Sequence, residues 1–122
     1  MAAMPRTVLI VDDHAGFRRT VRRSLELDGW HVVGEAADGA GALEAAGRLR
    51  PGLVLLDVGL PDSSGFAVAA ALHEARSADA VVLTSTRDAA DYGSLARGSR
   101  AAGFLAKGEL SGAALEGLLA ER

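Results

Sequence analysis

The sequence of 122 residues contains no cysteine, which excludes disulfide bonds and zinc sites built on thiolates. No apolar run approaches the roughly 18 residues that are needed to span a bilayer. Residues 1–6 are too few and too polar for a signal peptide. The net charge of −3 gives no basic signal for nucleic acid. We therefore expect a cytoplasmic protein that neither crosses a membrane nor binds nucleic acid directly.

A glycine-rich phosphate loop is also missing, although the chain has 15 glycines. The segment Gly39-Ala40-Gly41 opens a predicted helix, but it does not follow a strand with the P-loop pattern. Nucleotide binding therefore has little support in the sequence.

What the chain does contain is a regular alternation of short apolar runs with helical segments. Five strands are predicted, over residues 7–11, 30–35, 53–56, 80–83 and 103–106. Five helices are predicted, over residues 15–28, 40–49, 66–75, 89–99 and 111–121. Alternation at this spacing is typical of a parallel sheet that carries helices on both faces. The prediction is a single doubly wound α/β domain over residues 1–122.

The apolar spacing within the helices predicts which side of each helix faces the sheet. Phe17, Val21 and Leu25 recur every four residues on one side of the first helix. In the second helix, Leu43 and Ala46 are expected to face inward. The apolar stripe of the last helix is expected to consist of Leu115, Leu118 and Leu119.

Two predicted strands end directly in acidic residues. Asp12 and Asp13 follow the apolar run 8–11, and Asp57 follows the run 53–56. Such runs are typical of strands buried on both faces, and the carboxyl ends of parallel strands form the ligand crevice of an open sheet. Three carboxylates in one crevice repel one another unless a cation joins them. Oxygen ligands of this kind favour Mg²⁺.

Two later strands add hydroxyls and an amine to this edge. Thr84 and Ser85 follow the run 80–83, and Lys107 follows the run 103–106. Asp57 can serve as a nucleophile that forms an acyl phosphate. A hydroxyl and an ammonium group can then bind the remaining phosphoryl oxygens. The combination indicates phosphoryl chemistry.

The chain resembles the receiver domains of bacterial two-component response regulators over essentially its whole length. Four segments carry the resemblance: Val-Leu-Ile-Val-Asp12-Asp13-His14, Leu-Leu-Asp57-Val-Gly-Leu-Pro61-Asp-Ser-Ser-Gly65, Val-Val-Leu-Thr84-Ser85 and Ala101-Ala-Gly-Phe104-Leu-Ala-Lys107. The resemblance implies a flavodoxin-like fold with strand order 2-1-3-4-5. It also implies a sensor histidine kinase or phosphotransfer protein as partner, and a homodimer through the fourth helix and fifth strand.

The resemblance implies a role for each matching residue. Asp57 would be the phosphoacceptor, and Asp12 and Asp13 would bind Mg²⁺. The backbone carbonyl of Gly59 would be a further metal ligand, and Lys107 would pair with the acyl phosphate. The aromatic residue that changes position on phosphorylation would be Phe104.

The chain departs from the family pattern at four points. The strand pattern favours Thr84 as the switch hydroxyl, whereas the spacing to Lys107 suits Ser85. Many members have proline where Gly108 stands and glycine where Arg100 stands. Phe104 has no hydroxyl, so any switch through this residue must work by packing alone.

Other functions remain open at this point. The chain could be a stand-alone receiver or the N-terminal part of a DNA-binding response regulator, because the Asp12-Asp13-His14 start and the segment 32–36 look like the helix-turn-helix branch of the family. A Mg²⁺-dependent aspartyl-phosphate phosphatase would need a second acid two residues after the nucleophile, and Gly59 stands there. A pseudo-receiver that never becomes phosphorylated is a third alternative.

Several conspicuous residues have structural interpretations. His14 is expected to begin the first helix rather than to bind metal, and Trp30 is expected to be partly buried. His31 and His73 have no ligand partners at useful spacing. The basic run of the first helix is expected to be a solvated face, with docking of a phosphodonor as the alternative: Arg18, Arg19, Arg22 and Arg23.

Overall fold

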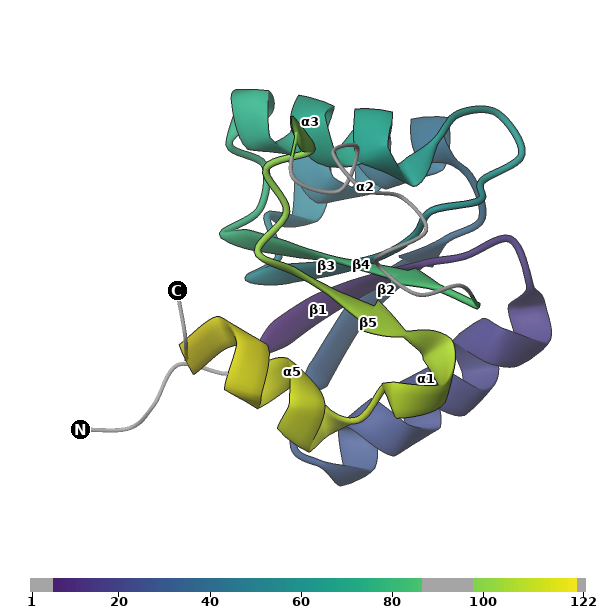
Figure 1. Ribbon diagram of the computed structural model, residues 1–122, viewed down its shortest axis with the longest axis vertical. Coiled ribbons are helices and arrows are strands. Elements are labelled where there is room, and N and C mark those ends of the chain that lie inside the picture. Colours follow the sequence, from purple (N-terminus) through teal and green to yellow (C-terminus); the bar gives the residue numbers. More distant parts are fainter. Residues whose placement is uncertain (1–5, 87–97, 121–122) are drawn as a thin grey trace.

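The computed structural model describes residues 6–86 and 98–120 and contains the predicted parallel sheet (Figure 1). Its strands are β1 Thr7–Val11, β2 His31–Ala36, β3 Leu53–Asp57, β4 Ala80–Ser85 and β5 Gly103–Ala106. They pair in the order β2-β1-β3-β4-β5, and all four pairings are parallel. Both the fold class and the strand order are therefore confirmed.

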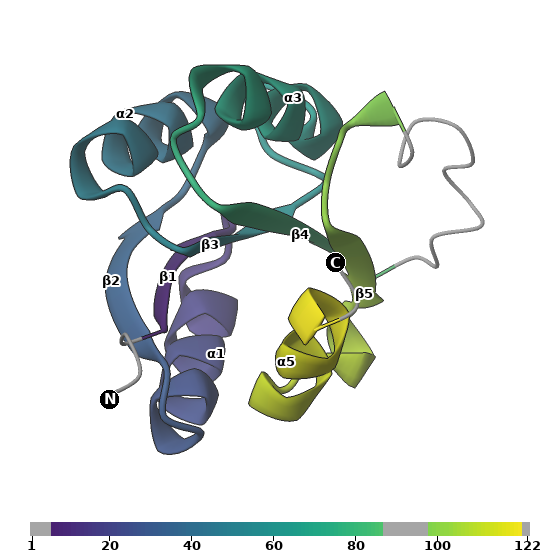
Figure 2. The same cartoon turned by 90° about the vertical axis from the view of Figure 1, so that its left-hand side faces the viewer.

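Helices cover both faces of this sheet. Their bounds are α1 Ala15–Leu27, α2 Gly39–Leu49, α3 Gly65–Ala75 and α5 Gly112–Ala120. Figure 2 shows α2 and α3 on one face of the sheet and α1 and α5 on the other. A short 3₁₀ turn over Lys107–Glu109, which the sequence analysis did not predict, follows β5 directly. The helix predicted over 89–99 lies almost entirely outside the described residues.

Side chains of the central strands alternate between two hydrophobic cores, because successive residues of a strand point to opposite faces. The core under α2 and α3 includes Leu9, Val54 and Leu83. The core under α1 and α5 includes Ile10, Leu55 and Val82. These six side chains are no more than 1% exposed, so the sheet is buried on both faces as its apolar runs predicted.

The inward face predicted for α2 is partly wrong. Ala46 is buried as expected. Leu43, which was predicted to face the core, is 41% exposed. The buried residues of α2 are Ala42, Ala45 and Ala46 together with Gly39, which recur at helical spacing. Leu43 is one residue past Ala42 and hence about 100° around the helix from it, at the border of this stripe. Small side chains, rather than the large one, face the sheet.

The other helix faces agree with the prediction. Val21 and Leu25 of α1 are buried, and Phe17 packs against the same core. Leu115 of α5 is fully buried, while its neighbours Leu118 and Leu119 are partly buried against that core.

Three arginines adopt the left-handed backbone conformation. Arg50 and Arg76 end α2 and α3 with φ values of 49° and 53°. Arg100 has a φ of 64° in the turn before β5. This is the conformation that glycine adopts without strain.

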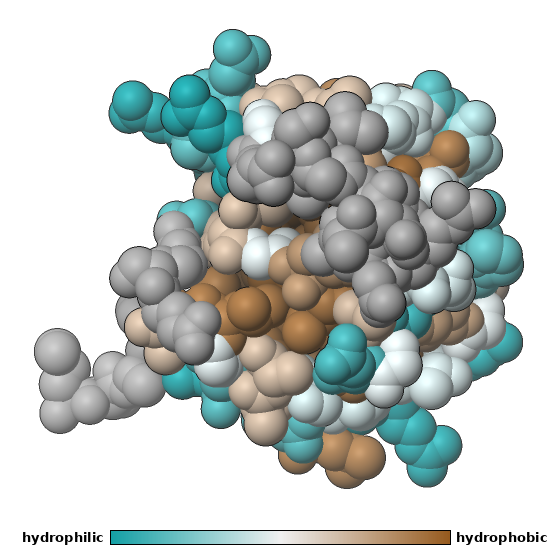
Figure 3. Space-filling view, in the orientation of Figure 1, coloured by the Kyte–Doolittle hydropathy of each residue, from teal (hydrophilic) through white to brown (hydrophobic). Residues whose placement is uncertain are grey.

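The edge strand β5 is less buried than the central strands. All four residues of β5 are only half-buried, whereas those of β3 and β4 are buried. Figure 3 shows apolar side chains gathered on the face of the molecule where β5 and α5 lie. None of the described helices is long and apolar enough to cross a membrane.

Candidate functional site

Strand alternation places four polar side chains on one face of the sheet at its carboxyl edge. Each lies two residues beyond a residue of the α1/α5 core: Asp12 beyond Ile10, Asp57 beyond Leu55, Thr84 beyond Val82 and Lys107 beyond Leu105. The period of two therefore carries all four toward the same side. Asp13 follows Asp12 directly in the sequence. We call the three acids Asp12, Asp13 and Asp57, together with Lys107, the acidic pocket.

Lys107 is held closest to Asp12 in this pocket. Its Nζ lies 2.6 Å from Asp12 Oδ2 and 3.7 Å from Asp57 Oδ2. The same ammonium group lies 4.3 Å from the centroid of the Phe17 ring, within range of a cation–π contact. The side chain of Asp12 is 1% exposed, and its other oxygen accepts a hydrogen bond of 2.8 Å from the backbone of His14.

The carboxyl group of Asp57 is harder to ionise than a free one. Burial raises the pKa of Asp57, and the nearby charge of Asp12 raises it further. The ammonium of Lys107 and a hydrogen bond from the Gly59 backbone act in the opposite direction, but they do not outweigh the first two causes. The pocket thus has an excess of negative charge that a cation would relieve.

Asp13 lies at the rim of the pocket and His14 begins α1. The predicted role of His14 as the residue that starts this helix is confirmed. Its ring also lies close to the acids, with Nδ1 at 3.2 Å from Asp12 Oδ1 and 3.0 Å from Asp13 Oδ1. Ligand atoms of these three residues lie within 4.8 Å of one another. The two carboxylates suit Mg²⁺, whereas an imidazole does not.

The basic run of α1 is more than a solvated face. Arg19 and Arg23 are exposed as expected. Arg18, however, donates a hydrogen bond of 2.6 Å to the backbone carbonyl of Asp12 and pairs with Glu35 of β2 at 3.0 Å. Arg22 pairs with the same glutamate, and its hydrogen bond is the main cause that lowers the pKa of Glu35. These contacts of Arg18, which support the backbone of Asp12, were not predicted, because no spacing in the sequence links Arg18 to β2.

The loop between β3 and α3 is a closed turn. Val58 donates to the carbonyl of Thr84 at 3.0 Å, and Gly65 donates to the carbonyl of Val58 at 2.8 Å. A Cβ atom at Gly65 would lie 2.4 Å from the carbonyl oxygen of Asp57, so this approach requires glycine. Gly59, whose carbonyl was predicted to bind metal, is exposed within this turn.

The two candidate hydroxyls face different sides of the sheet. Thr84 pairs with Asp57 across the β3–β4 ladder and shares the face of the acidic pocket. Ser85 follows Leu83 of the other core by two residues, and therefore shares the face of Phe104, which packs against that core. Both hydroxyl residues are buried.

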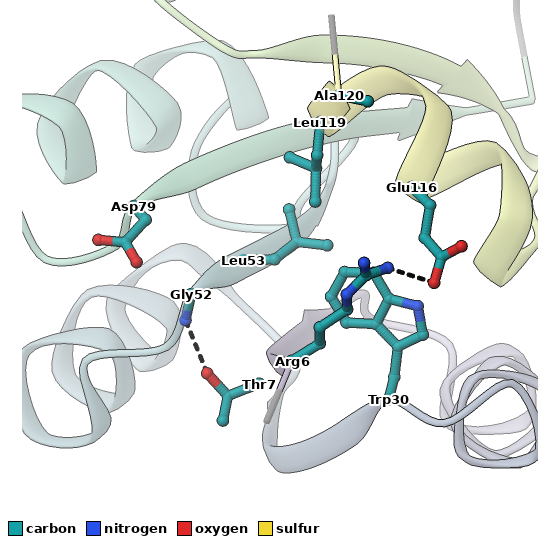
Figure 4. A pocket seen from close by; sticks show the side chains of 9 residues that line it. All are labelled: Arg6, Thr7, Trp30, Gly52, Leu53, Asp79, Glu116, Leu119 and Ala120. Atoms are coloured by element: carbon teal, nitrogen blue, oxygen red, sulfur yellow. Dashed lines mark hydrogen bonds and ion pairs between the residues drawn. The ribbon is translucent and has the colours of Figure 1, made fainter. Parts of the chain in front are cut away.

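A separate pocket of about 370 Å³ lies at the amino ends of the strands (Figure 4). Arg6 and Glu116 form an ion pair at its mouth, and Arg6 lies over the ring of Trp30. Trp30 is 4% exposed, hence more deeply buried than predicted. Its Nε1 has no hydrogen-bond partner among the described residues. None of the predicted site residues lines this pocket.

Comparison with known proteins agrees with the geometry of the acidic pocket. Residues 8–116 match the response regulator receiver domain. The chain is 45% identical to the probable transcriptional regulatory protein NarL of Mycobacterium tuberculosis, over 82% of this chain and 47% of that protein. It is 42% identical to the transcriptional regulatory protein PdtaR of the same species, over 78% of this chain and 49% of that protein. The chain thus spans about half the length of these relatives.

Solved structures show the same similarity in three dimensions. The signal receiver domain of the putative response regulator NarL from M. tuberculosis superimposes with a TM-score of 0.84 at 36% identity, covering 96% of this chain and 98% of that chain. A LuxR-family two-component response regulator from Aurantimonas sp. SI85-9A1 superimposes with a TM-score of 0.87 at 27% identity, covering 98% and 88%.

Proposed function

The chain belongs to the response regulator receiver family, and from this premise we propose that Asp57 is the residue that accepts the phosphoryl group. The chain is a phosphoacceptor signalling module rather than a classical enzyme. The observation that carries the assignment is the place of Asp57. It ends the central strand β3, beside Asp12 and 3.7 Å from the ammonium of Lys107.

The proposed reaction is an in-line transfer from a phosphohistidine of a sensor histidine kinase or phosphotransfer protein. A carboxylate oxygen of Asp57 attacks phosphorus, the P–N bond breaks, and the imidazole leaves with its electron pair and takes up a proton. The carboxylate is the nucleophile, so Asp57 must be ionised when it reacts, and its raised pKa opposes this ionisation. A cation in the pocket favours that ionised form.

Mg²⁺ is the proposed cofactor, and the donor set fits it. Asp12, Asp13 and Asp57 supply carboxylate oxygens, and Gly59 supplies a backbone carbonyl. When bound, the metal neutralises phosphoryl oxygens during transfer. The pKa of Asp57, which burial raises and the charge of Asp12 raises further, supports this proposal, because the ammonium of Lys107 alone does not cancel the negative charge of the pocket.

Lys107 and Thr84 are proposed to bind the phosphoryl oxygens after transfer. Lys107 would exchange part of its contact with Asp12 for the new phosphoryl group, which lies on the residue 3.7 Å away. Thr84, rather than Ser85, is proposed as the switch hydroxyl because it pairs with Asp57 and shares its face. Phe104, which already packs against the α2/α3 core, would respond by changing that packing.

The output of the switch is a second proposal. The printed names of the relatives describe transcriptional regulators that are about twice the matched length. We propose that this receiver controls transcription together with a DNA-binding unit. The receiver itself would not contact DNA. The predicted homodimer through the fourth helix and β5 stays a prediction, because residues 87–97 lie outside the described residues.

Intact-mass measurement tests the assignment of Asp57. The protein is incubated with phosphoramidate, once with Mg²⁺ and once with EDTA. The expected result is one added phosphoryl group that needs Mg²⁺ and is absent from Asp57→Asn. An undiminished signal in that variant would overturn the assignment, and a full signal in EDTA would overturn the role of Mg²⁺.

A further inference from the structure

Asp62 joins two parts of the molecule that lie far apart in sequence. It sits at the tip of the β3–α3 loop, and its Oδ1 accepts a hydrogen bond of 2.7 Å from the backbone of Gly39. Its Oδ2 accepts a bond of 3.0 Å from the backbone of Ala40. Both donors belong to the first turn of α2, whose N–H groups have no partner within the helix.

This contact is not the ordinary cap of α2. The local cap is Asp38, whose side chain accepts from the backbone of Gly41 at 2.7 Å. Asp62 comes from another loop and takes the two donors that Asp38 leaves. These donors lower the pKa of Asp62, the bond from Gly39 being the larger cause. The carboxylate is therefore ionised at neutral pH and well placed against the positive end of α2.

The backbone of Gly39 lies so close to the β3–α3 loop that a side chain at this position would have little room. A Cβ atom at Gly39 would lie 3.0 Å from Val68 and 3.2 Å from Asp62 Oδ1. It would also lie 3.3 Å from the Cβ of Ser63. A larger residue at position 39 would thus push the loop away from α2.

Both sides of the contact lead to the acidic pocket. On one side, the loop that carries Asp62 also carries Gly59, and a bridge between Gly59 and Ser64 closes it. On the other side, the backbone of Asp12 donates to the carbonyl of Ala36 at 3.1 Å, at the end of β2 directly before α2. Besides the direct pairing of β1 with β3, a second chain of contacts thus joins the loop of Gly59 to the backbone of Asp12, and Asp62 is one link in it.

We infer that Asp62 is a positioning residue, which fixes the β3–α3 loop so that the carbonyl of Gly59 is held at the proposed metal site. The role of Gly59 at the metal rests on the proposed function. The anchoring of the loop by Asp62 does not, because it follows from the hydrogen bonds alone. Asp62 touches neither the metal nor the phosphoryl group in this account. Its effect is transmitted through the geometry of the loop.

The decisive comparison is between Asp62→Ala and Asp38→Ala. Each variant removes one acidic side chain at the start of α2, but only the first releases the β3–α3 loop. In the metal-free protein, we expect amide hydrogen exchange at Gly65 to become faster in Asp62→Ala and to stay unchanged in Asp38→Ala. Unchanged exchange in both variants would overturn the anchoring role, whatever the protein does with metal.

Calorimetric titration with Mg²⁺ then tests the positioning role. We expect Asp62→Ala to bind Mg²⁺ about tenfold more weakly, at the low end of what supporting residues contribute to metal affinity. Asp62→Asn keeps one acceptor oxygen and should recover part of the loss, and Asp38→Ala should bind like the unmodified protein. Equal affinity in Asp62→Ala, or an equal loss in Asp38→Ala, would contradict the inference. Absence of Mg²⁺ binding by the unmodified protein would instead contradict the proposed function.

Discussion

The two ends of the sheet treat charge in opposite ways. At the amino ends, Arg6 pairs with Glu116, and both side chains are about half exposed. At the carboxyl ends, Asp12 and Asp57 are buried beside each other and share one ammonium group, that of Lys107. The first arrangement is close to balanced. In the second, burial raises the pKa of Asp57 and the charge of Asp12 raises it further, because the one ammonium group does not cancel the negative excess. The proposed site for a cation and a phosphoryl group is at the end where burial maintains an imbalance of charge.

We expect Lys107→Ala to lower the free energy of unfolding much more than Arg6→Ala does. Lys107→Ala leaves the buried carboxylate of Asp12 without its cation and should lower the free energy of unfolding by about 3 kcal/mol. Arg6→Ala removes an exposed pair and should cost about 1 kcal/mol or less. Denaturant unfolding in EDTA measures both. Equal costs would mean that the two ends do not differ in the way described here.

The switch hydroxyl gives the next largest expected effect, and it concerns function rather than stability. Thr84→Ala should leave Mg²⁺ affinity normal but impair the response to a beryllofluoride mimic of the phosphoryl group, because its hydroxyl faces the acidic pocket. Ser85→Ala should respond like the unmodified protein. Chemical shift changes across β4 and β5 report the response. Loss of the response in Ser85→Ala alone would show that the spacing to Lys107, and not the strand face, identifies the hydroxyl.

The pKa of Asp57 provides a pH test of the charge imbalance. Because this pKa is raised from 3.8, the folded metal-free protein binds more protons than the unfolded chain above that pH, and its stability falls as the pH rises through the interval. Asp57→Asn lacks this penalty. It should be more stable than the unmodified protein at pH 7, by about 1 kcal/mol, and the difference should vanish below pH 3.8. A variant that is less stable at pH 7 would contradict the sign.

The smallest effect is expected at the amino end. Trp30→Phe removes the buried N–H that has no partner among the described residues, which offsets the loss of packing. The free energy of unfolding should change by about 1 kcal/mol or less, and phosphorylation of Asp57 should be unchanged. A loss of phosphorylation in this variant would show that the two ends are coupled.

The sequence predicted the sheet and the acidic pocket because both follow from simple periodicities. Apolar runs of four residues locate buried strands, and a period of two carries Asp12, Asp57 and Lys107 to one face. The contacts of Arg18 and Asp62 could not be predicted in this way. They join backbone groups to side chains across elements, and such pairs leave no regular spacing in the sequence. Leu43 was predicted to face inward, whereas three alanines line the helix face that is buried.

The chemical location of the phosphoryl group decides whether Asp57 is the phosphoacceptor. After phosphorylation with phosphoramidate and Mg²⁺, borohydride reduces an aspartyl phosphate to homoserine and releases the phosphate. Digestion and tandem mass spectrometry then identify the reduced residue. We expect homoserine at position 57 and intact aspartate at positions 12 and 13. Homoserine at either of those two positions, with Asp57 intact, would contradict it.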